Sequence, residues 1–254
     1  MTILIRLRAL ALPLALTFAL AGGPLHAEET PAMIGQQAAA NPFADLYDAM
    51  QGGIDNEQIL DNMIQSITEE LVRKVPEFEL LEAEKPGLLA AIGASIRPPL
   101  ADYSSRVKAD YHPRMVKLFQ DGLTPEEAGQ LTDFYRSDMG RKLLAGVSTS
   151  YTGAQTLRGA MNNPEGEIPA ENISNDIKSA SIKAYLGLSL DERKALETLA
   201  AETPAFTKLN ALQPRINALR HEMENAPMLP EEEVRLQSSM EAAIQKHLGD
   251  LAKK

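Results

Sequence analysis

Apolar side chains recur at steps of three and four residues along almost the whole chain from Ile54 onward. In the segment 55–75 they are Ile59, Leu60, Met63, Ile64, Ile67, Leu71 and Val75. This spacing gathers apolar side chains on one face of an α-helix. The alternation of β-branched residues that is typical of strands is absent. The sequence therefore predicts an all-α fold, either an antiparallel helical bundle or an array of helix-turn-helix corners.

The first 27 residues have the features of a secretory signal peptide. Arg6 and Arg8 precede a largely apolar run that is too short to span a bilayer. We expect cleavage after Ala27, with Ala21 as the alternative site. No later apolar stretch approaches the ~20 residues that a membrane-spanning helix needs. The sequence therefore predicts a periplasmic or secreted protein with no transmembrane segment after signal removal.

The expected mature chain is strongly acidic and has no cysteine. The first 27 residues carry two arginines and no acid, so their removal takes the net charge from −10 to −12. A charge of this sign opposes binding to nucleic acid and to anionic lipid headgroups. Without disulfides, stability has to come from a buried core.

Two segments interrupt the helical pattern. Residues 28–53 read as a tether followed by a short helix, which Asn41 caps and which has Pro42 in its first turn. Residues 161–170 contain two prolines and a glycine, and we interpret them as a linker. The linker divides the chain into a helical domain at 54–160 and a second helical part at 171–254. The sequence leaves open whether these parts share one core.

Prolines and polar caps predict where several helices begin and end. Asp55 is expected to cap the helix at 55–75, with Gln58 as its reciprocal partner. A shorter helix is expected between Pro86 and the pair Pro98–Pro99. Pro113 is expected to kink the next helix near residues 109–113.

The second helical part is expected to hold four helices. The first has periodic apolar residues at Ile173, Ile177, Ile182 and Leu186, and two more cover residues 188–225. The last runs from about Pro230 to Leu251, with one apolar stripe of Leu236, Met240, Ile244 and Leu248.

One helix carries an aromatic row, in which Tyr103, Tyr111 and Phe119 alternate with Val107 and Met115 at four-residue steps. Core packing is the favoured interpretation, because a helix usually buries such a stripe. The alternative is that the row lines a cavity for a ligand.

The stretch 123–146 reads as a corner between two helices. Thr124 and Glu127 form a capping box, with Pro125 at the first helical position. Phe134 and Tyr135 end that helix, with at least one ring in the core. Ser137 or Asp138 caps the next helix, and Gly140 allows a close approach of neighbouring chain.

Three cations lie in the same corner, namely Arg136, Arg141 and Lys142. Solvation is sufficient to explain them, and binding of an anionic partner is the minority alternative.

A second copy of the corner follows 65 residues later. Leu123, Thr124, Glu127 and Leu131 match Leu188, Ser189, Glu192 and Leu196. With one residue inserted, Ser137 and Lys142 match Thr203 and Lys208. This is a degenerate internal repeat, for which common origin and convergence on the rules of helix capping both remain open.

The order of residues 96–144 resembles an exported bacterial family, the domain-of-unknown-function family 2059. The matching residues are Thr124, Glu127, Phe134, Tyr135, Ser137, Gly140 and Lys142. Asp138 stands where the family commonly has proline, and it keeps an acid at the start of the helix. The resemblance implies an all-helical, exported protein and no established chemistry.

Catalytic and metal-binding motifs are absent from the sequence. His112, His221 and His247 are far apart and lack metal-ligand spacing. No serine lies in a nucleophile elbow, and no glycine-rich phosphate loop is present. We therefore expect no cofactor, no metal and no enzymatic activity.

Three functions remain. The favoured one is a non-enzymatic interaction or structural module of the cell envelope, with another envelope protein as partner. The alternative is a carrier or sensor of a small apolar ligand that uses the row Tyr103–Phe119. The third is a hydrolase whose carboxylate pair forms only in three dimensions. Candidate contact residues for a partner or ligand are Tyr103, Tyr111, Phe119, Tyr135, Arg136, Arg141 and Lys142.

Overall fold

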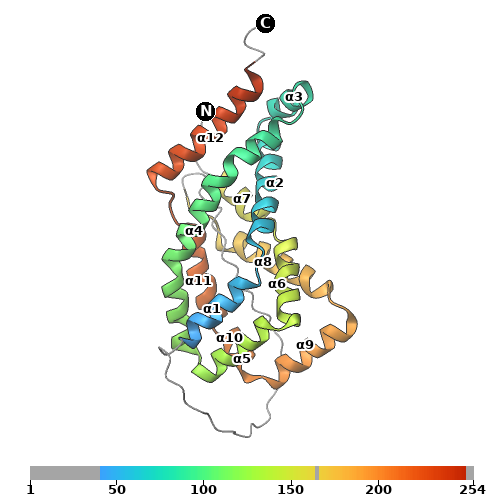
Figure 1. The fold of residues 1–254 in the computed structure, drawn as a ribbon, viewed down its shortest axis with the longest axis vertical. Coiled ribbons are helices and arrows are strands. Elements are labelled where there is room, and N and C mark those ends of the chain that lie inside the picture. The colour runs from blue at the N-terminus through green and yellow to red at the C-terminus, as the bar shows by residue number, and fades with distance from the viewer. Residues whose placement is uncertain (1–40, 164–165, 250–254) are drawn as a thin grey trace.

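The computed structural model describes residues 41–163 and 166–249, which form twelve helices (Figure 1). They are α1 (Pro42–Gly52), α2 (Asn56–Lys74), α3 (Glu77–Glu84), α4 (Leu88–Gly122), α5 (Pro125–Arg136), α6 (Asp138–Ser150), α7 (Ala154–Asn162), α8 (Ala170–Leu186), α9 (Leu190–Glu202), α10 (Pro204–Ala211), α11 (Gln213–Glu224) and α12 (Pro230–Leu248). The predicted all-α fold is confirmed. The predicted signal peptide and the residues up to 40 lie outside the described part of the chain.

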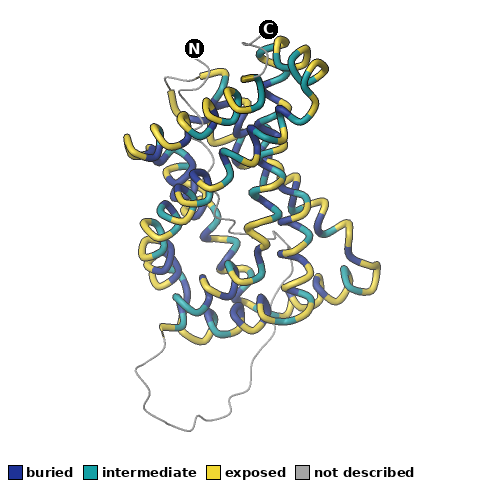
Figure 2. Tube along the Cα trace, turned by 45° about the horizontal axis from the view of Figure 1, so that its top comes forward, coloured by how far each residue is buried: buried dark blue, intermediate teal, exposed yellow. Residues whose placement is uncertain are grey.

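The long helix α4 is the centre of the molecule. It packs against α1, α2, α11 and α12, while α6 packs against α8 and α1 against α5. One hydrophobic core runs from Phe43 in α1 to Met240 in α12. Figure 2 shows the buried residues along the inner sides of the helices. Helices on both sides of the segment 161–170 therefore contribute to the same core.

The prediction that a short helix ends at Pro98–Pro99 is wrong, because α4 continues through Pro98, Pro99 and Pro113. Each proline removes one backbone hydrogen bond and costs about 3 kcal/mol inside a helix. Fully buried side chains before and after the pair, such as Ile92, Ile96 and Leu100, hold both parts in the core. Tertiary packing therefore outweighs the local penalty. Figure 1 shows that α4 changes direction along its length; a kink at residues 109–113 stays a prediction.

Two local predictions at the start of the chain have different outcomes. Asn41 caps α1, and its Oδ1 accepts from the N–H of Phe43 at 3.1 Å, as predicted. Asp55 caps α2 by accepting from the N–H of Gln58 at 3.0 Å. The prediction that the Gln58 side chain bonds with the Asp55 N–H is wrong, because that N–H donates to Ser148 Oγ at 2.9 Å. A side chain from α6 thus replaces the local partner.

Other corrections concern helix number and exposure. Helix α3 was not predicted, and residues 188–225 form three helices instead of two. The extra break lies at Leu212, and Pro214 has no N–H with which to continue the hydrogen-bond ladder of α10. In α8, small residues face inward, since a Cβ on Gly146 of α6 would lie 3.0 Å from the Cβ of Ala184. Ile182 lies nine residues from the buried Ile173, about half a turn around the helix, and Ile182 and Leu186 are exposed.

The corner between α5 and α6 is built as the sequence predicts. Thr124 and Glu127 form the complete capping box of α5. Phe134 and Tyr135 are both buried, and Ser137 Oγ caps α6 by accepting from the N–H of Gly140 at 3.1 Å. A Cβ on Gly140 would lie 2.1 Å from the carbonyl oxygen of Phe134. The glycine therefore lets the start of α6 touch the end of the preceding helix.

Replacing Ser137 with alanine is expected to lower the free energy of unfolding by about 1 kcal/mol. The hydroxyl accepts from Gly140 and donates to the carbonyl oxygen of Phe134 at 2.6 Å, and both bonds are lost. Urea denaturation checks the value. An unchanged midpoint and slope would show that this cap does not hold the corner.

The second copy of the corner reproduces the first capping box but not the second cap. Ser189 and Glu192 form a complete box, whereas Thr203 makes no side-chain capping bond. Ion pairs connect the two copies reciprocally. Lys142 of the first copy lies 2.6 Å from Glu192 of the second, and Lys208 of the second lies 2.6 Å from Glu127 of the first. Equivalent residues therefore exchange partners across a local pseudo-twofold relation.

Candidate functional site

The aromatic row lies mostly in the core. Tyr103 and Phe119 are fully buried, and Tyr103 Oη donates to the carbonyl oxygen of Ala226 at 2.6 Å. Tyr111 is half-buried, and the guanidinium of Arg114 lies 4.9 Å from its ring centre. The row thus joins α4 to the segment before α12, which agrees with the favoured interpretation as core packing.

The other candidate contact residues surround the α5–α6 corner. The ring of Tyr135 is buried and lies 5.1 Å from that of Phe134. Arg136 is exposed, Arg141 pairs with Asp138 at 2.5 Å, and Lys142 pairs with Glu192. Two of the three cations therefore already have carboxylate partners within the chain.

A charged cluster that the sequence did not reveal lies in the core. Arg220 and Glu224 are one turn apart on α11, and both side chains are buried. Neither carboxylate oxygen of Glu224 has a hydrogen-bond partner in the described part of the chain. Burial raises the pKa of Glu224 to about 8, although the positive charge of Arg220 acts in the opposite direction. Burial likewise raises the pKa of Tyr47 to about 12.

Asp176 of α8 is the second buried acid near this cluster, and its negative charge also raises the pKa of Glu224. Its two oxygens accept from the N–H groups of Gln155 and Thr156 at 3.1 and 2.8 Å. Asp176 therefore caps α7, whose own preceding residue, Gly153, makes no side-chain cap. This is a structural role that links α8 to α7.

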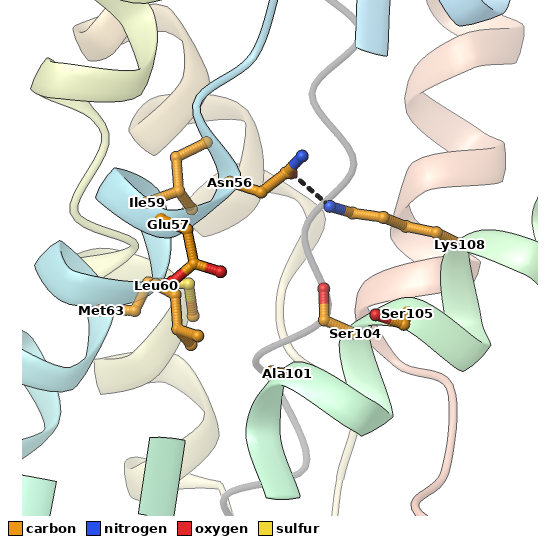
Figure 3. A pocket seen from close by; sticks show the side chains of 9 residues that line it. All are labelled: Asn56, Glu57, Ile59, Leu60, Met63, Ala101, Ser104, Ser105 and Lys108. Carbon is orange, nitrogen blue, oxygen red and sulfur yellow. Dashed lines mark hydrogen bonds between the residues drawn. The ribbon is translucent and has the colours of Figure 1, made fainter. Parts of the chain in front are cut away.

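A pocket of about 220 Å³ lies between α2 and α4 (Figure 3). Both helices contribute apolar and polar groups to its lining. Ala101, Ser104, Ser105 and Lys108 follow one another at steps of three, one and three residues, which places them on one face of α4. The remaining lining residues belong to α2 and are Asn56, Glu57, Ile59, Leu60 and Met63.

Lys108 is the cationic group of this pocket. Its Nζ donates to Asn56 Oδ1, so its partner among the described residues is an amide rather than a carboxylate. Burial lowers the pKa of Lys108, and the negative charge of Glu224 partly offsets that effect. The acid in the lining, Glu57, pairs with Arg97 at 2.6 Å. The arrangement therefore offers an amine, two hydroxyls and an apolar wall to a small molecule.

A hollow of about 500 Å³ lies between α4 and α11, and charged side chains of its lining form ion pairs with one another. Arg114 pairs with Glu222 at 2.5 Å, and Lys117 pairs with Asp121. A third hollow, of about 290 Å³, lies between α8 and α11. There His221 Nε2 bonds with the carbonyl oxygen of Ile168 at 2.9 Å. In the pocket between α2 and α4, by contrast, the lysine is bonded to the amide of Asn56, and the acid of the lining is paired with Arg97.

Metal chemistry has no obvious place in the described part of the chain. Within residues 41–163 and 166–249, no three His, Asp or Glu side chains gather closely enough to hold a metal ion. The described helices also include none that is long and apolar enough to cross a bilayer.

The corner between α8 and α9 carries an exposed apolar patch, which consists of Ile182, Leu186 and Leu190 (the α8–α9 patch). Their exposed fractions are 49, 59 and 59%. Ile182 and Leu186 are one turn apart on α8, so they share a face. Figure 1 shows this corner at the edge of the molecule, and α9 packs mainly against α10. Exposed apolar groups that are adjacent in this way are typical of interaction sites.

Sequence reasoning missed both the pocket and the patch. The pocket left a weak signal, the spacing of Ala101, Ser104, Ser105 and Lys108 beside the apolar stripe of α4. The patch also left a signal, since the five-residue step from Ile177 to Ile182 places Ile182 and Leu186 on the side of the helix away from Ile173.

The comparisons with known proteins agree with the resemblance over one segment. Residues 110–151, from the second half of α4 to the end of α6, match the family model of domain-of-unknown-function 2059, described as an uncharacterised protein conserved in bacteria. No curated protein and no solved structure is significantly similar to the chain. The matched segment contains the α5–α6 corner, and it includes no residue of the α8–α9 patch or of the pocket lining.

Proposed function

We propose that this protein is a non-enzymatic interaction module of the bacterial cell envelope, which acts after export and binds another envelope protein through the α8–α9 patch. The exposure of Ile182, Leu186 and Leu190 at one corner carries the proposal. Burying a large aliphatic side chain is worth about 1.5–3 kcal/mol, so leaving three of them in water has a cost that a partner would remove.

The surroundings of the patch define the partner. Exposed residues beside it include Lys178 and Lys183 on α8 and Asp191 on α9. An apolar centre with charges of both signs around it is typical of protein–protein interfaces. The occupant that fits is an amphipathic helix of another protein, which lays its apolar face on the patch.

Export follows from the expected signal peptide. The acidic composition favours a protein that stays in solution and away from anionic lipid headgroups. The family over residues 110–151 is bacterial, which is consistent with an envelope location.

Photocrosslinking in living cells tests this function. A benzophenone amino acid in place of Leu186 is expected to form one adduct of defined mass with another protein. Ile182→Glu in the same chain is expected to abolish that adduct and to change stability by less than about 0.5 kcal/mol, because the side chain is exposed.

Val234 on α12 provides the matched control, since it is an apolar residue of similar exposure, 62%, on a different helix. The probe at Val234 should give no adduct, and Val234→Glu should leave the Leu186 adduct unchanged. Failure of Ile182→Glu to reduce the adduct would refute the α8–α9 patch as the docking face. An adduct between two copies of this chain would replace the proposed partner with self-association.

A further inference from the structure

We propose that the pocket between α2 and α4 binds a small amphipathic acid, with the carboxylate on Lys108, Ser104 and Ser105 and the short apolar chain against Ile59, Leu60 and Met63. This inference is independent of the α8–α9 patch. It also differs from an apolar-ligand site in the aromatic row, because none of Tyr103, Tyr111 and Phe119 lines this pocket.

The size of the pocket restricts the ligand. Pockets for drug-sized ligands are about 300–1,000 Å³, and this one is about 220 Å³. A short-chain fatty acid of about six carbons is small enough, whereas a phospholipid or a folded peptide is not.

The polar end of the pocket restricts the charge. Figure 3 shows Lys108, Ser104 and Ser105 extending from α4 on the side opposite the apolar residues of α2. Together they supply an ammonium and two hydroxyl donors, which match the acceptors of one carboxylate. Asn56 currently accepts from Lys108, and an amide oxygen is a weaker competitor than a carboxylate.

Lys108 is half-buried, which strengthens this recognition. Coulomb attraction at a partly buried amine is larger than at an exposed one, because water screens it less. Burial opposes the charge of the free amine, and a bound carboxylate would counter that effect. The pairing of Glu57 with Arg97 leaves less negative charge to repel an incoming acid.

Hexanoate titration followed by NMR of the methyl groups of Ile59, Leu60 and Met63 tests the site. Saturable shifts of these methyls are expected in the unmodified mature chain. Lys108→Met keeps the apolar stem and removes the charge, and it is expected to weaken hexanoate at least about tenfold. Hexan-1-ol has the same chain without the charge, and we expect it to bind the unmodified chain more weakly than hexanoate does. We also expect hexan-1-ol to bind Lys108→Met as tightly as it binds the unmodified chain.

Lys117→Met is the matched control, because it removes a cation from the same helix outside the pocket. It should leave hexanoate binding unchanged. Ala101→Leu keeps Lys108 and fills the cavity, so it should abolish the shifts even if Lys108→Met does not fold. The inference is overturned if hexanoate causes no saturable shift, if Lys108→Met binds it as tightly as before, or if hexan-1-ol binds equally well.

Discussion

Replacing Arg220 with methionine is expected to lower the free energy of unfolding by about 3–5 kcal/mol at pH 9. Arg220 is the buried cation that opposes the charge of Glu224 from one turn away. Without it, the pKa of Glu224 rises further, because burial and the like charge of Asp176 then act with less opposition. At pH 9 the folded chain must either bury a carboxylate that has no hydrogen-bond partner among the described residues or bind a proton that the unfolded chain does not bind. At pH 5 the loss is expected to be smaller, since Glu224 is then protonated. Urea denaturation at both pH values measures the difference.

A second replacement separates the charge from the packing. Arg220→Met combined with Glu224→Leu is expected to regain most of the stability at pH 9, because it leaves no buried charge without a partner. An equal loss from Arg220→Met at pH 5 and pH 9, with no recovery in the double variant, would show that Arg220 acts only through its volume.

The unmodified chain provides the third measurement for this cluster. The pKa of Glu224 is raised from 4.5 to about 8 in the folded protein. The protonated carboxyl group therefore contributes to the free energy of unfolding in full below pH 4.5, and that contribution is lost as the pH rises to about 8. Within that window the loss is up to about 1.4 kcal/mol per pH unit. Glu224→Gln cannot titrate, so the difference between the two pH profiles isolates this carboxyl group.

Replacing Gly140 with alanine is expected to destabilise the protein by about 3 kcal/mol, the upper end of the usual range for overpacking. The new Cβ would meet the carbonyl oxygen of Phe134 at 2.1 Å and the Cα of Tyr135 at 2.8 Å. Both are backbone atoms, so no side-chain rotation relieves the overlap, and the α5–α6 corner has to open. Thermal or urea unfolding measures the effect.

Gly129 supplies the control within the neighbouring helix. A Cβ at Gly129 of α5 meets no atom within 4 Å. Gly129→Ala is therefore expected to stabilise the protein by about 0.5–1 kcal/mol, the usual gain from replacing glycine in a helix. Equal effects of Gly140→Ala and Gly129→Ala would refute the close approach at the corner.

The two predicted capping boxes differ in how far the sequence predicts them. The capping box of Thr124 and Glu127 depends on residues three positions apart, and it forms as expected. Asp55 has the same local pattern, but Ser148 from α6 takes the place of its reciprocal partner. Local patterns hold only where no distant group offers a better hydrogen bond.

Prolines lead to the same conclusion in α4. Pro98 and Pro99 predict a helix end from backbone chemistry alone, and the helix nevertheless continues. The buried residues on both sides decide the outcome, because the packing energy of a core helix exceeds the cost of two missing backbone bonds.

The all-α fold, the caps at Asn41, Asp55 and Ser189 and the α5–α6 corner could be predicted from the sequence, because they follow from residues within a few positions of one another. The packing of the helices against one another was needed to show that Lys142 pairs with Glu192 and that the side of α8 with Ile182 and Leu186 faces solvent. It also placed Lys108 opposite the apolar residues of α2 and buried Glu224 beside Arg220. These features join segments far apart in the chain, and their energies depend on burial and charge that helical periodicity does not encode.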